Sequence, residues 1–179
     1  MSPDSRYGLV SIYGLVAGPV SRAMAAHLVP GSPGEQPPGD VRMLRALVVG
    51  HDRGWRHELF ERSFEVGAAS DRVGIRLHPL EGPLGEGAVE VRSAPVATGT
   101  LQVPPSGEPV VLAVDHATHG GYPVGAVVIS ADLAELGRCR PGDRVRLVAV
   151  EPDEALDALD SLRRAVRDAP AGTHPTAAG

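Results

Sequence analysis

Short apolar segments separated by glycine and proline turns limit the folds that are available to this chain. Three of them follow one another in the second half of the sequence, at Val110 to Val114, Val124 to Ile129 and Arg144 to Val150. They are bounded by Gly, Pro or Asp and rich in valine, which is typical of strands. They do not alternate with long helices as strands do in a series of βαβ units. The pattern therefore favours an antiparallel sheet.

The other elements are expected from the same patterns. Further strands are predicted at Met43–Val49, Val73–Leu77, Ala88–Val91 and Gly99–Val103. Short helices are predicted at Trp55–Phe64 and Ala131–Gly137, and a longer C-terminal helix at Glu151–Ala169, with Pro152 in its first turn. A mainly β chain with two or three short helices and a C-terminal helix is predicted to close into a mostly antiparallel β-barrel.

The length of 179 residues fits one domain with a single core. Residues 1–40 are expected to be an irregular N-terminal segment that ends in a Pro/Gly-rich linker. Residues 41–169 are expected to form the folded domain, and residues 170–179 a disordered tail.

Composition excludes several partners and mechanisms. The net charge of −5 leaves no basic surface for nucleic acid, and no apolar run reaches the ~20 residues of a membrane span. We expect a cytoplasmic location, since no secretory signal pattern is present. All 17 basic residues are arginine. The chain therefore has no lysine to carry biotin, to form a Schiff base or to act as a Walker A lysine.

Polar groups lie where the predicted strands end, which is typical of a binding site built on a sheet. Gln102 offers one acceptor and two donors for a carboxylate or a lactam. In the turn Gly120-Gly121-Tyr122, the glycines either supply positive φ angles or let a ligand approach the backbone amides, and the Tyr122 hydroxyl is a candidate donor. His119 is a candidate acid–base residue because imidazole titrates near neutral pH.

Two aspartates, Asp71 and Asp115, are further candidates for a catalytic base. Arg72 is a candidate for bidentate binding of a substrate carboxylate. In the alternative interpretation, Ser70-Asp71-Arg72 caps a turn through side chain to backbone bonds. Asp115 is not accompanied by a cluster of further ligands, so no metal site is predicted.

Three residues near the end of the predicted barrel are interpreted mainly as structural. Asp132 is expected to cap the short helix that follows it, and Asp143 to be a turn residue in Pro-Gly-Asp. Cys139 lies between two arginines, which could lower its thiol pKa, but a small apolar filler is the favoured interpretation.

Several short motifs occur in a characteristic order along the chain. They are Val41–Arg45, Trp55, Ser70–Leu77, Ser93–Val96, Gln102–Pro105 and Gly120–Pro123. This order resembles the C-terminal half of the biotin-dependent carboxyltransferase family, which includes KipA, the C component of 5-oxoprolinase and the carboxyltransferase region of urea amidolyase. The resemblance covers about Val41 to Val150 and implies a cyclophilin-like barrel.

The resemblance also implies a function. It suggests a subunit or half-subunit of an ATP-dependent 5-oxoprolinase or related amide hydrolase, which converts 5-oxoproline to glutamate together with a KipI-like protein (the B component of 5-oxoprolinase) and a third subunit. In that scheme Arg72, Gln102 and the Gly120-Gly121-Tyr122 turn hold a small amide or lactam substrate. No cofactor is covalently bound; ATP is used with the partner subunits, and biotin is involved only if another chain supplies it.

Several positions depart from the family pattern. The resemblance implies Glu at Ala94, Gln at Arg138 and a threonine or other small residue at His119. Only forty residues precede Val41, where relatives carry another domain of similar size. These departures leave an alternative open, in which the chain is a non-catalytic interaction module that binds a KipI-like partner, or a truncated remnant.

Overall fold

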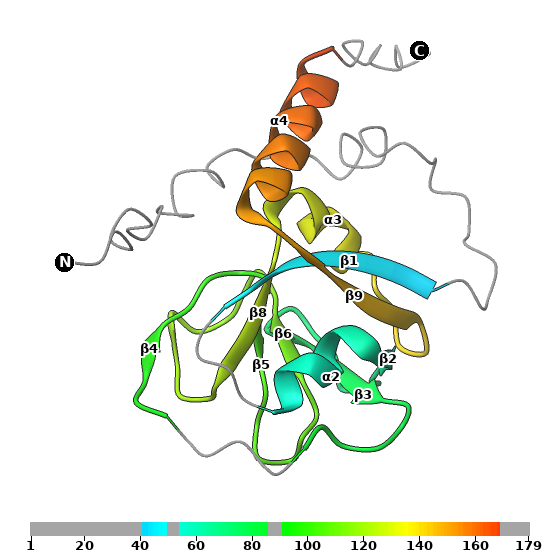
Figure 1. Cartoon of the computed structure of the whole chain (residues 1–179), viewed down its shortest axis with the longest axis vertical. Coiled ribbons are helices and arrows are strands. Elements are labelled where there is room, and N and C mark those ends of the chain that lie inside the picture. The colour runs from blue at the N-terminus through cyan, green and yellow to red at the C-terminus, as the bar shows by residue number, and fades with distance from the viewer. Residues whose placement is uncertain (1–40, 50–53, 86–90, 169–179) are drawn as a thin grey trace, which may run out of the picture.

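Seven strands close into a barrel because apolar side chains alternate along them and face one interior. A computed structural model describes residues 41–49, 54–85 and 91–168 of the chain. The barrel strands are β1 (Val41–Val48), β2 (Ser63–Val66), β3 (Gly74–Pro79), β5 (Thr100–Gln102), β6 (Val110–Leu112), β8 (Val124–Val128) and β9 (Arg144–Val150). They are joined in the order β1-β8-β5-β6-β3-β2-β9 (Figure 1). Leu44 and Ala46 of β1 and Val145 and Leu147 of β9 show the alternation, since all four are buried.

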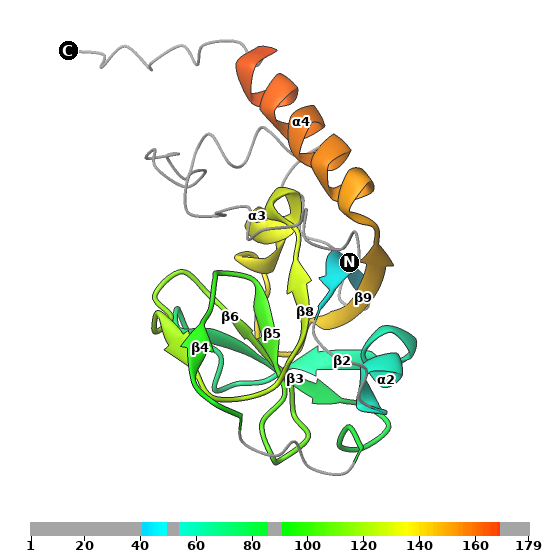
Figure 2. The same ribbon diagram turned by 60° about the vertical axis from the view of Figure 1, so that its left-hand side comes forward.

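The barrel confirms the predicted mainly β, cyclophilin-like and mostly antiparallel fold. β1 pairs in parallel with β9, whereas the other barrel pairs are antiparallel. β4 (Ala94–Pro95) and β7 (His119–Gly120) form a separate two-stranded sheet that is not part of the barrel, and β4 is labelled in Figure 2. The strand predicted at Ala88–Val91 lies almost wholly outside the described residues, as do residues 1–40 and 170–179.

The predicted helix at Trp55–Phe64 is too long. The helix α2 covers Trp55–Glu61, and Phe64 belongs instead to β2. Phe64 and Val66 are buried in the core, while Glu65 between them is exposed. Two-residue alternation therefore replaces the helical spacing after Glu61, and the pairing of β2 with both β3 and β9 fixes the change.

The C-terminal helix α4 (Pro152–Asp168) agrees with the prediction, and Pro152 occupies its first position. It contacts η2 (Ser130–Asp132), a single 3₁₀ turn that leads into α3 (Leu133–Leu136). In both views α4 projects away from the barrel, and none of its residues is fully buried (Figures 1 and 2). None of the helices among the described residues is long and apolar enough to cross a membrane.

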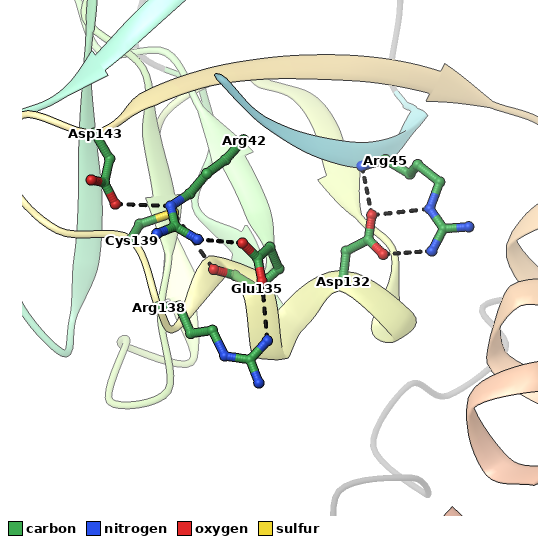
Figure 3. A network of polar contacts seen from close by, with 7 residues as sticks. All are labelled: Arg42, Arg45, Asp132, Glu135, Arg138, Cys139 and Asp143. Carbon is green, nitrogen blue, oxygen red and sulfur yellow. Dashed lines mark hydrogen bonds and ion pairs between the residues drawn. The ribbon is translucent and has the colours of Figure 1, made fainter. Parts of the chain in front are cut away.

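Two arginines of β1 attach this strand to the segment that follows β8 (Figure 3). Arg42 donates from Nε to Asp143 Oδ2 at 2.8 Å and from Nη1 to Glu135. Arg45 donates to the Asp132 carboxylate from its backbone N at 2.8 Å, from Nε at 3.1 Å and from Nη2 at 2.6 Å. The bonds are charge-assisted and partly shielded from water, so they hold β1 in place against η2 and α3.

The structure corrects one of the three structural predictions for this region and confirms the other two. Asp132 makes no capping bond to α3, because Arg45 takes both of its carboxylate oxygens. Asp143 is a turn residue, as predicted, and accepts a bond from Arg140 N at 2.9 Å. Cys139 packs against the core, and burial raises the pKa of its thiol to about 12. The apolar-filler interpretation is therefore confirmed and the activated thiolate is not.

Candidate functional site

The candidate site is organised around the side chain of Gln102, the last residue of β5. Gln102 is only 5% exposed, and its Nε2 donates to the carbonyl oxygen of Tyr122 at 3.4 Å. The amide lies directly against Gly120 of β7, so a Cβ atom built on Gly120 would overlap Gln102 Nε2 and lie 3.1 Å from Cδ. Gly120 is therefore needed for space: any side chain there would displace the Gln102 amide.

The positive-φ interpretation of the paired glycines is wrong. Neither Gly120 nor Gly121 has a positive φ; the described glycines that do are Gly82, Gly99, Gly107 and Gly142. At Gly121 an added Cβ would meet only Val91 O, at an ordinary distance of 3.6 Å. The two glycines thus differ, since a Cβ would clash with a neighbouring side chain only at position 120.

An open cleft with a volume of ≈ 460 Å³ lies beside this contact. We call it the first cleft, and its lining residues are Val73, Val91, Ser93, Gln102, Leu112, Ala117, His119, Gly120, Gly121 and Tyr122. Five of the eight residues predicted from the sequence are therefore brought together here. The size suits a small-molecule ligand. Ser93 was not among the predicted residues.

A second cleft of ≈ 320 Å³ adjoins the first, and they share Gln102, Leu112 and Tyr122. Its other lining residues are Arg76, Pro104, Ser106, Glu108 and Val110. The sequence analysis did not select Arg76 or Glu108. The alternation along β3 indicates that Arg76 points outward, but only the structure shows that a cleft lies on that side.

His119 is the one predicted acid–base residue that lines either cleft. Its Nδ1 lies 3.1 Å from the hydroxyl oxygen of Thr118, which can fix the ring orientation. The imidazole is exposed, so it can exchange protons with solvent or with a ligand in the first cleft.

Arg72 and Asp115 pair with each other and line neither of these two clefts. Arg72 Nε lies 2.8 Å from Asp115 Oδ2, and the backbone N of Asp115 donates to Arg72 O at 2.8 Å. The two side chains are 79% and 49% exposed. The pair joins the start of β3 to the loop after β6, and each charge offsets the other.

Asp71 also lies outside the clefts. Its Oδ1 accepts bonds from Val73 N at 2.8 Å and Gly74 N at 3.0 Å. These bonds, Gly74 first, lower the pKa of the Asp71 carboxyl, which makes it a weaker base. Ser70 Oγ accepts from Arg76 N at 2.9 Å, so this segment has the bonds that the turn-capping alternative requires. A catalytic role for Asp71 stays a prediction.

Within residues 41–49, 54–85 and 91–168, no group of three His, Cys, Asp or Glu side chains is placed to hold a metal ion. The chemistry available in the first cleft comes from neutral donors and one imidazole. Such a set can bind a small polar molecule and transfer a proton to or from it.

Comparisons with known proteins agree on one family. A family model described as the carboxyltransferase domain, subdomain A and B, matches residues 30–149. The C component of the Haemophilus influenzae 5-oxoprolinase is 37% identical over 123 residues, which cover 63% of this chain and 37% of that protein. The corresponding C component from Escherichia coli is 31% identical over 115 residues, or 63% of this chain and 36% of that protein. The chain thus matches little more than a third of these relatives' length.

A solved structure confirms the fold. The urea amidolyase of Kluyveromyces lactis superposes with a TM-score of 0.65, covering 82% of this chain and 9% of that protein at 20% identity. At this identity the likeness concerns the barrel and does not extend to individual site residues.

Proposed function

Because this chain belongs to the carboxyltransferase domain family, subdomains A and B, we propose that it is a subunit of a 5-oxoprolinase-like assembly. In this assembly it acts with a KipI-like protein and a third subunit to open 5-oxoproline to glutamate, and ATP hydrolysis supplies the free energy. The two relatives named as the C component of 5-oxoprolinase motivate the substrate. The observation that carries the proposal is the buried Gln102 amide at the border of two small clefts.

Five residues of the first cleft have a role in this proposal. The Gln102 amide offers an acceptor to the lactam N–H and a donor to the lactam oxygen. Gly120 and Gly121 also line the cleft, and the Tyr122 hydroxyl is a further donor. His119 accepts or returns a proton as the amide bond opens. Biotin is not attached to this chain, which has no lysine.

Reconstitution with the partner subunits tests the proposal. We expect 5-oxoproline-dependent ATP hydrolysis by the complete mixture, and its loss when this chain alone is left out. Full activity without this chain would contradict the proposal. A mixture with ATP but without 5-oxoproline controls for uncoupled hydrolysis.

A second candidate function is a non-catalytic interaction module that binds the KipI-like partner. The register of the small sheet favours it, because Ala94 lies directly opposite Gly120, at the position where the family resemblance implies Glu. Position 94 thus offers no carboxylate that could act on a ligand. A stable complex that co-purifies with this chain but shows no 5-oxoproline-dependent activity would favour this second function.

A further inference from the structure

We propose that Arg76 binds the carboxylate of the ligand at the junction of the two clefts. This inference deepens the proposed function and rests on it, since it assigns the carboxylate of a 5-oxoproline-like ligand to one side chain. The sequence alone had pointed to Arg72 for this role. The structure gives the two arginines different surroundings.

Arg76 is held by the barrel itself. It lies between the buried residues Ile75 and Leu77 on β3, so its side chain points outward. Its backbone N donates to Ser70 Oγ at 2.9 Å, and its side-chain Nε donates to Ala69 O at 3.2 Å. These bonds fix the base of the guanidinium and reduce the rotamer entropy that a flexible arginine would lose on binding.

The terminal nitrogens of Arg76 remain available for a ligand. Within the described part of the chain, the bond to Ala69 O is the only hydrogen bond that the guanidinium makes. Its charge also lies close enough to Asp71 to help lower the pKa of that carboxyl. Asp71 accepts bonds from two backbone amides through Oδ1, and among the described residues it forms no ion pair with Arg76.

Arg72 is engaged elsewhere. Its Nε lies 2.8 Å from the Asp115 carboxylate, and it lines neither cleft. A ligand carboxylate would have to compete with Asp115 for it. Arg76 lines the second cleft together with Gln102 and Tyr122, which also line the first. A ligand held by the Gln102 amide therefore lies beside the cleft that Arg76 lines.

Glu108 is the acidic side chain that lines the same cleft. Its Oε1 lies 2.9 Å from His78 Nδ1, so this oxygen is engaged by the imidazole. Its charge still opposes an anion, whereas it would attract an N–H group on the ligand. The cleft therefore suits a molecule that has a carboxylate and an N–H group close together, as 5-oxoproline does.

Ligand binding to the full chain tests the assignment. We would titrate 5-oxoproline and its neutral analogue 5-oxoprolinamide, which replaces only the carboxylate, and follow the Arg Nε–H and Gln side-chain NMR signals. The variants are Arg76→Gln and the matched control Arg72→Gln, with Arg76→Lys to retain charge without the planar fork. Circular dichroism checks that each variant is folded.

We expect the unaltered chain to prefer the acid over the amide. Arg76→Gln should weaken acid binding by roughly 10- to 100-fold and leave amide binding unchanged, because only the charged hydrogen bonds are lost. Arg72→Gln should retain the preference, and Glu108→Gln should strengthen acid binding. A preference that survives in Arg76→Gln but disappears in Arg72→Gln overturns the inference while leaving the proposed function intact.

Failure of the proposed substrate gives a different result. If neither compound binds the unaltered chain, the proposed function loses its support, and acetate then tests the arginine alone. A saturable shift of the Arg76 Nε–H signal with acetate, without a matching shift of the Arg72 Nε–H signal, supports the carboxylate site. The absence of a shift with all three compounds rejects it.

Discussion

Replacing Gly120 with alanine tests whether the Gln102 amide is held in place by the glycine beside it. A Cβ at position 120 would overlap Gln102 Nε2, and Gln102 is only 5% exposed. The Gln102 side chain must then move toward the cleft and give up its 3.4 Å bond to Tyr122 O. The clashing atoms are the end of a flexible side chain beside a cleft, so this overpacking costs about 1 kcal/mol, the low end for a core, and the weak bond adds about 0.5 kcal/mol.

Gly121→Ala is the matched control. Both substitutions remove a glycine without a positive φ, so both gain about 0.4–1 kcal/mol from the reduced entropy of the unfolded chain. At position 121 the added Cβ meets only Val91 O at 3.6 Å. The entropy terms cancel in the comparison, and we expect Gly120→Ala to be less stable than Gly121→Ala by about 1.5 kcal/mol.

Urea unfolding, followed by circular dichroism and by the fluorescence of Trp55, measures this difference, since Trp55 is the single tryptophan and is buried. The double variant Gln102→Ala/Gly120→Ala should recover at least about 1 kcal/mol relative to the sum of the single changes, because the clashing amide is absent. Equal stability of the Gly120→Ala and Gly121→Ala variants would show that Gly120 does not confine the Gln102 amide. Additive effects in the double variant would show the same.

Three further predictions concern the structural residues. Asp132→Asn should destabilise the fold by about 1–2 kcal/mol in urea unfolding, because Arg45 then donates to a neutral amide oxygen and no longer to a carboxylate. An unchanged midpoint would contradict the role of this pair in holding β1 against η2. Asp71 keeps its carboxyl pKa below the ordinary 3.8, so its stabilisation is present above that pH and is lost as the pH falls below it. Between about pH 5 and pH 3 the unaltered protein should therefore lose more stability than Asp71→Asn. Parallel curves of stability against pH would show that the Asp71 carboxylate charge contributes nothing. Cys139, whose thiol pKa is raised to about 12, should react slowly with iodoacetamide at about pH 8 until urea unfolds the chain; rapid alkylation of the folded protein would contradict its burial.

The sequence predicts most of the barrel because its strands are short apolar runs between glycine and proline turns. Arg144–Val150 has the predicted bounds, and no end of the other barrel strands that were predicted differs by more than two residues. β2 was missed because Phe64 falls at a spacing that also fits the preceding helix. β4 and β7 contain two residues each, which is too short for any periodic pattern.

The candidate site was only partly predictable for a related reason. Gln102, His119 and the Gly120-Gly121-Tyr122 turn were selected as polar or small residues at strand ends, and the structure places them around one cleft. Their local sequence did not reveal why Gly120 is a glycine, because its neighbour Gln102 is eighteen positions away. Only tertiary structure gives that contact.

The choice between arginines shows the same limit. Arg72 and Arg76 lie four positions apart and look equivalent as candidate carboxylate ligands. Arg72 is paired with Asp115, which lies 43 residues further along the chain, whereas Arg76 lines a cleft. A long-range ion pair of this kind has no signature in one sequence.

Substituting the Gln102→Ala variant for the unaltered chain in the reconstituted assembly, and measuring 5-oxoproline-dependent ATP hydrolysis, tests the proposed site itself. We predict that the complex still assembles and that kcat/KM for 5-oxoproline falls by roughly 10- to 100-fold, which corresponds to the loss of about 1.4–2.8 kcal/mol of interaction with the ligand. An assembled complex that keeps its full activity would contradict the placement of the substrate beside Gln102.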